Sequence, residues 1–110
     1  MTPSNIEILT LTVAKLTEPV TIGQLVGYEG APAGVSEPVL GIAKYSADAG
    51  RPLAVVSQGL VEMKASVPIA AGDLVYPDAN GNPTNVGTEN PCGIAFQGGA
   101  AGDLIAVLLK

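Results

Sequence analysis

The sequence lacks most of the side chains that catalytic and metal sites require. Its 110 residues include no histidine, no tryptophan and a single cysteine. Zinc and haem sites depend on His and Cys ligands, and a serine nucleophile needs a neighbouring base, so all three are disfavoured. Cys92 lies in an apolar run and reads as a buried structural thiol. We therefore expect a protein that is not an enzyme and that uses no metal or cofactor.

Charge is also scarce, and positive charge most of all. Only 14% of the residues are charged, with five Lys and Arg against ten Asp and Glu, which gives a net charge of -5. The cations are scattered, so no basic stripe exists that could neutralise nucleic-acid phosphates or an anionic membrane. We expect neither of these partners. A small domain that is 47% hydrophobic and so poor in charge is expected to cover part of its surface with a partner or with copies of itself.

Long hydrophobic segments are missing. The longest apolar run, Leu104 to Leu109, is far too short to span a bilayer. Residues 1–5 show neither the cationic start nor the apolar stretch of a signal peptide, so we expect synthesis in a cytoplasm without an export signal. No window keeps a 3.6-residue apolar period, which predicts little helix.

Glycine and proline are abundant and evenly spread. The 14 Gly and 9 Pro residues divide the chain into short apolar segments, the pattern of strands joined by turns. The core should consist of Val, Leu, Ile and Ala, because aromatic residues make up only 4%. Asn80-Gly81 predicts a hairpin with a type I′ turn. We expect strands at about residues 6–13, 21–28, 39–45, 53–57, 60–66, 73–76, 91–96 and 103–109 of an all-β domain.

The first expected strand changes phase along its length. Ile6 and Ile8 alternate with Glu7, whereas the following apolar positions are Leu9, Leu11 and Val13. One interpretation is a β-bulge near Ile8. The other is that Ile6 and Ile8 serve a different surface from the rest of the strand. On the second interpretation, residues 1–8 form a short N-terminal arm or edge strand and residues 9–110 form the β domain.

Three short sequence blocks occur twice in the same order. Ile22–Val26 matches Ala71–Val75, and Leu40–Ala43 matches Cys92–Ala95. The third pair is Ala49–Val55 with Ala101–Val107. This predicts an internal duplication, with half-repeats at about residues 20–59 and 69–110. The halves are expected to pair around a pseudo-two-fold axis into a small barrel or clip-shaped sheet.

Carboxylates are the remaining candidates for chemistry. Asp73 and Asp103 lie in identical Ala-Ala-Gly-Asp-Leu segments. They would form an acid pair only if one had an apolar pocket and a raised pKa, and capping of their own turns is the better interpretation. The polar segment Asp78–Asn82 lacks the ligand order of a calcium loop and predicts a hairpin tip.

The repeated blocks resemble those of a known family. Gly23-x-Leu25-Val26, Gly41-Ile42-Ala43, Ala71–Val75 and Pro91–Ala95 resemble the phage capsid-cement proteins and, through them, the head decoration proteins of lambda-type phages. The resemblance covers about residues 6–110. It implies a small β-clip or tulip-like barrel that forms a homotrimer. It also implies binding to the major capsid protein on the outer surface of the virion, stabilisation of the expanded head, and no catalytic site.

The resemblance and the phase change together suggest where the capsid would bind. The lambda-type proteins have a long N-terminal arm, whereas the polar lead here is only Thr2 to Asn5. The expected capsid-binding residues are Thr2, Pro3, Ser4, Asn5, Ile6, Glu7 and Ile8. If they do not bind the capsid, the loops Glu29–Pro38 and Pro77–Pro91 are the next candidates.

Two other functions stay open at this point. Ala70–Val75 also resembles a segment of sugar-binding β-clip domains, so a sugar- or ligand-binding module without catalysis is the alternative. A trimeric nucleotide hydrolase of the dUTPase type shares the clip shape, but its Asp-bearing motifs have no match in this chain.

Overall fold

A computed structural model describes residues 6–35 and 37–109 of the chain, and within these ranges the fold contains strands and turns but no helix. The predicted all-β class is therefore confirmed. The eight strands are β1 (Ile6–Val13), β2 (Leu25–Gly27), β3 (Val39–Ala43), β4 (Leu53–Lys64), β5 (Leu74–Pro77), β6 (Pro83–Thr84), β7 (Gly93–Gln97) and β8 (Leu104–Leu109).

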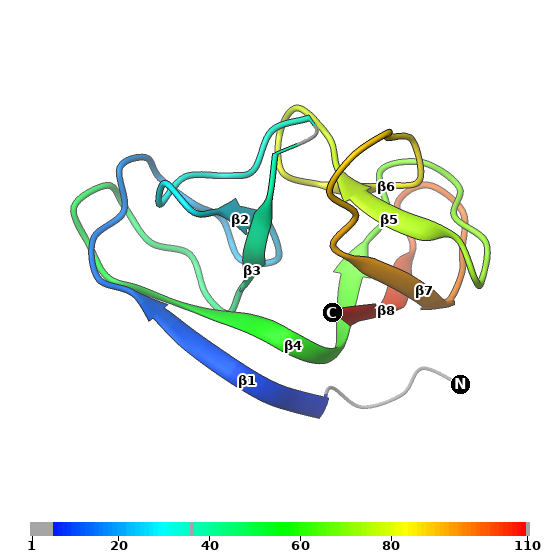
Figure 1. The fold of residues 1–110 in the computed structure, drawn as a ribbon, viewed down its shortest axis with the longest axis horizontal. Helices are drawn as coiled ribbons and strands as arrows, with labels where there is room; N and C mark the ends of the chain where they lie inside the picture. The colour runs from blue at the N-terminus through cyan, green and yellow to red at the C-terminus, as the bar shows by residue number, and fades with distance from the viewer. Residues whose placement is uncertain (1–5, 36, 110) are drawn as a thin grey trace.

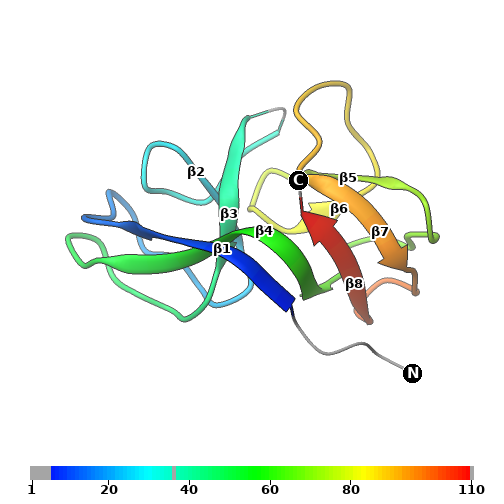
Figure 2. The same cartoon turned by 60° about the horizontal axis from the view of Figure 1, so that its bottom comes forward.

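The strands form one sheet that curls into a nearly closed, barrel-like shape (Figures 1 and 2). Its order is β2-β3-β4-β8-β7-β5-β6, with β1 also paired to β4. Val56 of β4 pairs with both β1 and β3, and Gly59 pairs with both β1 and β8. β1 therefore lies along one edge of β4, and β3 and β8 lie one after the other along its other edge.

The long strand β4 corrects one expectation. The sequence predicted two strands separated at Gln58-Gly59, but β4 runs without a break from Leu53 to Lys64. It bends instead, and Gly59 takes a φ of 139°, a value that residues with a Cβ rarely adopt. The glycine that suggested a turn is what allows a single strand to bend and serve two parts of the sheet (Figure 1).

The Asn80-Gly81 hairpin is present, but its turn differs from the predicted type. β5 and β6 pair antiparallel, with Pro77 opposite Pro83. Gly81 has a φ of 78°, whereas Asn80 is not among the described residues with positive φ, so the turn is not type I′. The side chain of Asp78 organises the loop, because its Oδ1 accepts the N–H groups of Asn80 at 2.8 Å and Asn82 at 3.0 Å.

The two halves of the sheet have the same pairing at matched positions. We call β1, β2, β3 and the start of β4 the first half, and the end of β4 with β5, β7 and β8 the second half. Leu25 pairs with Ile42 in the first half, as Leu74 pairs with Ile94 in the second. The duplication itself stays a prediction. Three backbone hydrogen bonds of the first half have a counterpart in the second half. The N–H of Gly23 bonds to Ala43 as that of Gly72 bonds to Ala95, and Leu16 bonds to Arg51 as Ala65 bonds to Asp103. The third pair is Gly50 to Leu16 and Gly102 to Ala65.

Two buried clusters of aliphatic side chains hold the sheet together. The smaller cluster belongs to the first half and contains Leu16, Val20, Val26, Ala43, Leu53 and Val55. The larger one joins both halves, because Leu25, Ile42 and Val56 of the first half share it with Val61, Val75 and Val107 of the second. Both clusters consist mainly of the predicted Val, Leu, Ile and Ala, and the larger one also contains Met63 and Cys92.

Two glycines allow neighbouring strands to approach closely. A Cβ on Gly41 of β3 would collide with the carbonyl oxygen of Val56 on β4. A Cβ on Gly93 of β7 would collide in the same way with the carbonyl oxygen of Leu108 on β8. The obstacle is backbone in both cases, so it cannot be relieved by a change of rotamer.

Asp73 and Asp103 cap their turns, as predicted. The Oδ2 of Asp73 accepts the N–H of Ala70 at 2.9 Å, and the Oδ2 of Asp103 accepts the N–H of Ala100 at 3.0 Å. The Nδ2 of Asn85 also donates to Asp73 at 3.0 Å. The hydrogen bond from Asn85, followed by that from Ala70, lowers the pKa of Asp73 below its usual value of 3.8.

The described part of the chain also contains no helix that is long and apolar enough to cross a membrane.

We predict that Gly41→Ala and Gly93→Ala each lower the free energy of unfolding by roughly 1–3 kcal/mol, the usual range for forcing an extra methyl into a packed site. Gly27→Ala is the matched control, because the atoms nearest its added Cβ lie at 3.7 Å. Urea unfolding followed by circular dichroism measures all three variants. Equal stability of the three would show that β3 and β7 can shift away from their neighbours.

We also predict that Asp73→Asn leaves the protein folded and changes how its stability depends on pH. Because the folded-state pKa of Asp73 is lowered, its contribution is complete above the unfolded pKa and is lost as the pH falls through the folded pKa. The stability difference between native protein and variant should therefore shrink below about pH 3.9. Urea unfolding at several acidic pH values measures this difference. A difference that grows with acid would contradict the assignment.

Candidate functional site

Strand β1 is held from one side only. It pairs antiparallel with β4 from Ile6 opposite Leu60 to Val13 opposite Leu53. No other strand within the described ranges pairs with β1, so its second edge faces outward (Figure 2). A strand edge of this kind presents backbone N–H and C=O groups that another chain can pair with.

The pairing of β1 is irregular at the position where its sequence changes phase. The register shifts between Glu7 and Leu9, and again between Leu9 and Thr10. Thr10 pairs with Val56 of the larger cluster, whereas Leu11 pairs with Val55 of the smaller one. Glu7 lines a hollow together with Val56, so Glu7 lies on the same face of β1 as Thr10. In a regular strand, residues three positions apart would lie on opposite faces. These shifts support the β-bulge interpretation.

Ile8, the residue at the irregularity, is exposed to solvent. Its exposed fraction is 71%, against 36% for Leu11, while Val13 is half-buried against the smaller cluster. An aliphatic side chain this exposed contributes little to the protein's own core, and its burial by a partner would be favourable.

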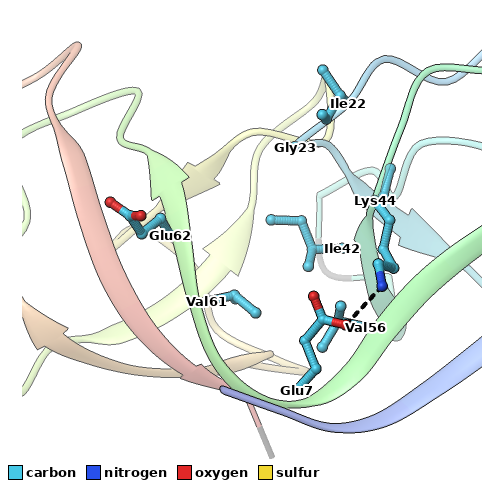
Figure 3. Close-up of a pocket in the computed structure, with 9 residues that line it drawn as sticks. Glu7, Ile22, Gly23, Ile42, Lys44, Val56, Val61 and Glu62 are labelled. Carbon is cyan, nitrogen blue, oxygen red and sulfur yellow. Dashed lines mark hydrogen bonds and ion pairs between the residues drawn. The ribbon is translucent and has the colours of Figure 1, made fainter. Parts of the chain in front are cut away.

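An ion pair ties the start of β1 to the end of β3. The Nζ of Lys44, which follows β3, lies 2.7 Å from the Oε1 of Glu7 (Figure 3). Both side chains are about one third exposed, so the pair adds little stability. Its effect is to orient Glu7 along one rim of a hollow of about 190 Å³. Ile42, Val56 and Val61 line this hollow, together with Glu7, Ile22, Gly23, Ala43, Lys44 and Glu62.

The hollow is open and chemically simple. Its charged groups are the paired Glu7 and Lys44 and the carboxylate of Glu62, which comes from β4 (Figure 3). Across the described residues, His, Cys, Asp and Glu nowhere gather in a group of three that could hold a metal ion.

The remaining candidate groups have structural roles. Cys92 is buried, and burial raises the pKa of its thiol to about 12, so it stays protonated at neutral pH. Asp78 is occupied by the N–H groups of its own loop. Asp73 and Asp103 cap separate turns and show no acid pair.

The structure describes only part of the predicted binding segment, and its binding role stays a prediction. Thr2, Pro3, Ser4 and Asn5 lie outside the described residues. Ile6 takes part in β1 opposite Leu60, Glu7 is ion-paired with Lys44, and Ile8 is exposed. Sequence reasoning missed Lys44, whose only signal was its place directly after the Gly41-Ile42-Ala43 block.

The two loops considered as alternative contacts meet each other. The N–H of Leu25 donates to the carbonyl oxygen of Gly81 at 2.7 Å. The Nε2 of Gln24 donates to the carbonyl oxygen of Asn80, also at 2.7 Å. The tip of the 77–91 loop is thus fixed against Gln24 and Leu25. Gly81 in the same tip also lies against Pro32 and Ala33 of the 29–38 loop, and the two loops form one end of the barrel (Figure 1).

Comparisons with known proteins agree with this reading of the fold. The N-terminal base of the head fiber protein gp8.5 of bacteriophage phi29 has a similar crystal structure, with a TM-score of 0.73. The two chains are 17% identical, and the match covers 93% of this chain and 95% of the phi29 chain. At this identity the likeness shows a shared fold. No curated protein matches the sequence.

The family assignment comes from the sequence itself. The profile of the phage cement protein family matches residues 4–110, which is nearly the whole chain and includes every described strand. The match also bears out the resemblance carried by the repeated Gly-x-Leu and Gly-Ile-Ala blocks. The chain belongs to the phage cement protein family.

Proposed function

We propose that the protein binds the outer surface of a phage capsid as a homotrimer and stabilises the expanded head. Membership of the phage cement protein family gives the protein a structural role in the phage head. The proposal adds the outer surface, the trimer, the stabilising effect and the absence of catalysis. The observation that carries it is the one-sided pairing of β1, which leaves a strand edge and an exposed isoleucine for a partner.

The contact with the major capsid protein is proposed to use residues 2–8. A capsid segment that added itself as a strand to β1 would gain backbone hydrogen bonds and bury Ile8. β1 is already paired with β4 from Ile6 to Val13, so this part of the edge is ordered before binding. Pre-ordering lowers the entropy lost on association.

Repetition would make such a small contact sufficient. A strand edge with one exposed aliphatic side chain supports weak binding by itself. In a trimer, three copies of the edge bind together, and the second and third contacts form at high effective concentration. A cement protein with a modest contact per chain would still hold neighbouring capsid subunits together.

We predict that Ile8→Asp leaves the thermal transition within a few degrees of the native value and weakens attachment to purified heads at least tenfold. The reason is that the carboxylate would be desolvated in the contact. Val86→Asp is the matched control, because Val86 is 73% exposed and lies in the 77–91 loop. Co-sedimentation with heads measures both variants. If only the Val86 variant fails to attach, the contact lies at the loop end of the barrel.

Deletion of Thr2 to Asn5 is predicted to leave all eight strands in place, because these residues precede the start of β1. Attachment to heads should weaken by an order of magnitude or more. Circular dichroism reports the fold and co-sedimentation reports attachment. Normal decoration by the shortened chain would restrict the contact to β1 itself or move it elsewhere.

A further inference from the structure

A row of four aliphatic residues crosses the outer face of the second half. Leu60 of β4 pairs with Leu108 of β8, Leu108 pairs with Ile94 of β7, and Ile94 pairs with Leu74 of β5. We call these four residues the outer row. Their neighbours along the strands, Val61, Val75, Ala95 and Val107, point into the larger buried cluster. The outer row therefore lies on the opposite face of the sheet, and none of its positions carries a charge.

The matched row of the first half is buried. Leu25, Ile42 and Val56 occupy the positions of Leu74, Ile94 and Leu108, as the shared strand pairing shows. The exposed fractions of the buried row are 0%, 5% and 2%. Leu74 and Leu108 are 45% and 39% exposed, and Ile94 is partly exposed. The same residue types in the same pairing are thus core in one half and surface in the other.

The second half of the same chain covers the buried row. Ile42 and Val56 line one hollow with Val61 (Figure 3). All three belong to the larger cluster, as does Met63. Val61 and Met63 come from the end of β4. Val61 pairs with Val107 of β8, and Met63 pairs with Ile105. In the same arrangement, Leu11 of β1 pairs with Val55 of β4, and Val13 pairs with Leu53.

Of the two residues matched to this cover, Leu11 is exposed, whereas Val13 is half-buried against the smaller cluster. Leu11 corresponds to Val61, and both Leu11 and its neighbour Leu9 are exposed in the single chain. The outer row of the second half is thus exposed, and so are Leu9 and Leu11 on β1 of the first half. These two surfaces cannot meet within one chain, because β1 and β8 lie along opposite edges of β4.

We infer that the outer row is a self-association surface, covered by Leu9 and Leu11 on β1 of a second copy of this chain. The contact would repeat between copies the packing that already joins the two halves. It is head-to-tail, because two different patches meet, and a head-to-tail contact closes into a ring when the rotation permits. The inference rests on the proposed homotrimer and names the faces that form it.

The surface beside the outer row has a shape that suits this contact. A hollow of about 260 Å³ lies at one end of the row, lined by Leu74, Pro91, Gly93 and Ile94. It is mainly aliphatic and would receive a leucine side chain from the neighbouring copy. Each partner in a standard interface buries about 800 Å², so the strands around the row must contribute as well, which the head-to-tail arrangement allows.

The first test compares charged variants on the two proposed faces. Leu108→Lys and Leu11→Lys should each convert the oligomer into an 11 kDa monomer that keeps its thermal transition. The control Val86→Lys places the same charge on an exposed aliphatic side chain that belongs to neither proposed face, and it should stay oligomeric. Sedimentation equilibrium at micromolar concentration measures all four proteins. A monomeric native protein, or variants as oligomeric as the control, would overturn the inference.

The second test asks whether the two faces touch. A Leu11→Cys and Leu108→Cys double variant should form disulfide-linked oligomers on oxidation, seen on a non-reducing gel. The chain's own Cys92 is buried and will not compete. A Leu11→Cys and Val86→Cys variant, and each single Cys variant, should give at most traces. Cross-linking no stronger than these controls would show that β1 does not cover the outer row.

Head attachment separates this inference from the proposed function. A native protein that is monomeric yet decorates heads would overturn the self-association surface and leave the capsid contact standing. Loss of attachment in Ile8→Asp with an unchanged oligomer would affect only the capsid contact. If Leu108→Lys fails to decorate heads although the native protein is monomeric, the capsid and not a second copy covers the row.

Discussion

The backbone pairing of β4 is the interaction on which the rest of the structure depends. This strand pairs with β1 along one edge, and with β3 and then β8 along the other. It also supplies buried side chains to both clusters, with Leu53 and Val55 in the smaller and Val56, Val61 and Met63 in the larger. A change that straightened the strand at Gly59 would separate the halves and uncover the larger cluster, which both halves share.

The sequence allowed the class of fold to be predicted because strand signals are local. Alternating apolar residues and evenly spaced Gly and Pro predicted the eight expected segments, and β1 has the predicted bounds. Local signals failed where long-range pairing decides the outcome. Gly59 suggested a turn, but partners on both edges hold β4 extended through it. Asn80-Gly81 suggested a type I′ turn, but the carboxylate of Asp78 satisfies the loop N–H groups in another conformation.

At the candidate site too, some features were visible in the sequence and others depend on long-range pairing. The phase change at Ile8–Leu9 was visible in the sequence, yet the irregular pairing behind it became apparent only from the register between β1 and β4. The ion pair from Glu7 to Lys44 joins residues 37 positions apart, and no sequence pattern links them. The burial of Leu25 and the exposure of Leu74 were equally beyond prediction, because the surrounding sequence motifs are nearly the same and only the position in the barrel differs.

The scarcity of charge acquires a physical meaning from this difference between the halves. In a protein built to remain a monomer, the exposed row of the second half would be expected to carry polar or charged residues, as the outward faces of antiparallel sheets usually do. Here it keeps the residue types of the buried row, and β1 keeps exposed leucines beside an exposed isoleucine. Water contact with these groups is unfavourable in the free chain and is relieved when a neighbour covers them. In the assembly proposed above, a chain of this composition would have a lower free energy than alone, which is the condition that a shell-bracing protein must meet.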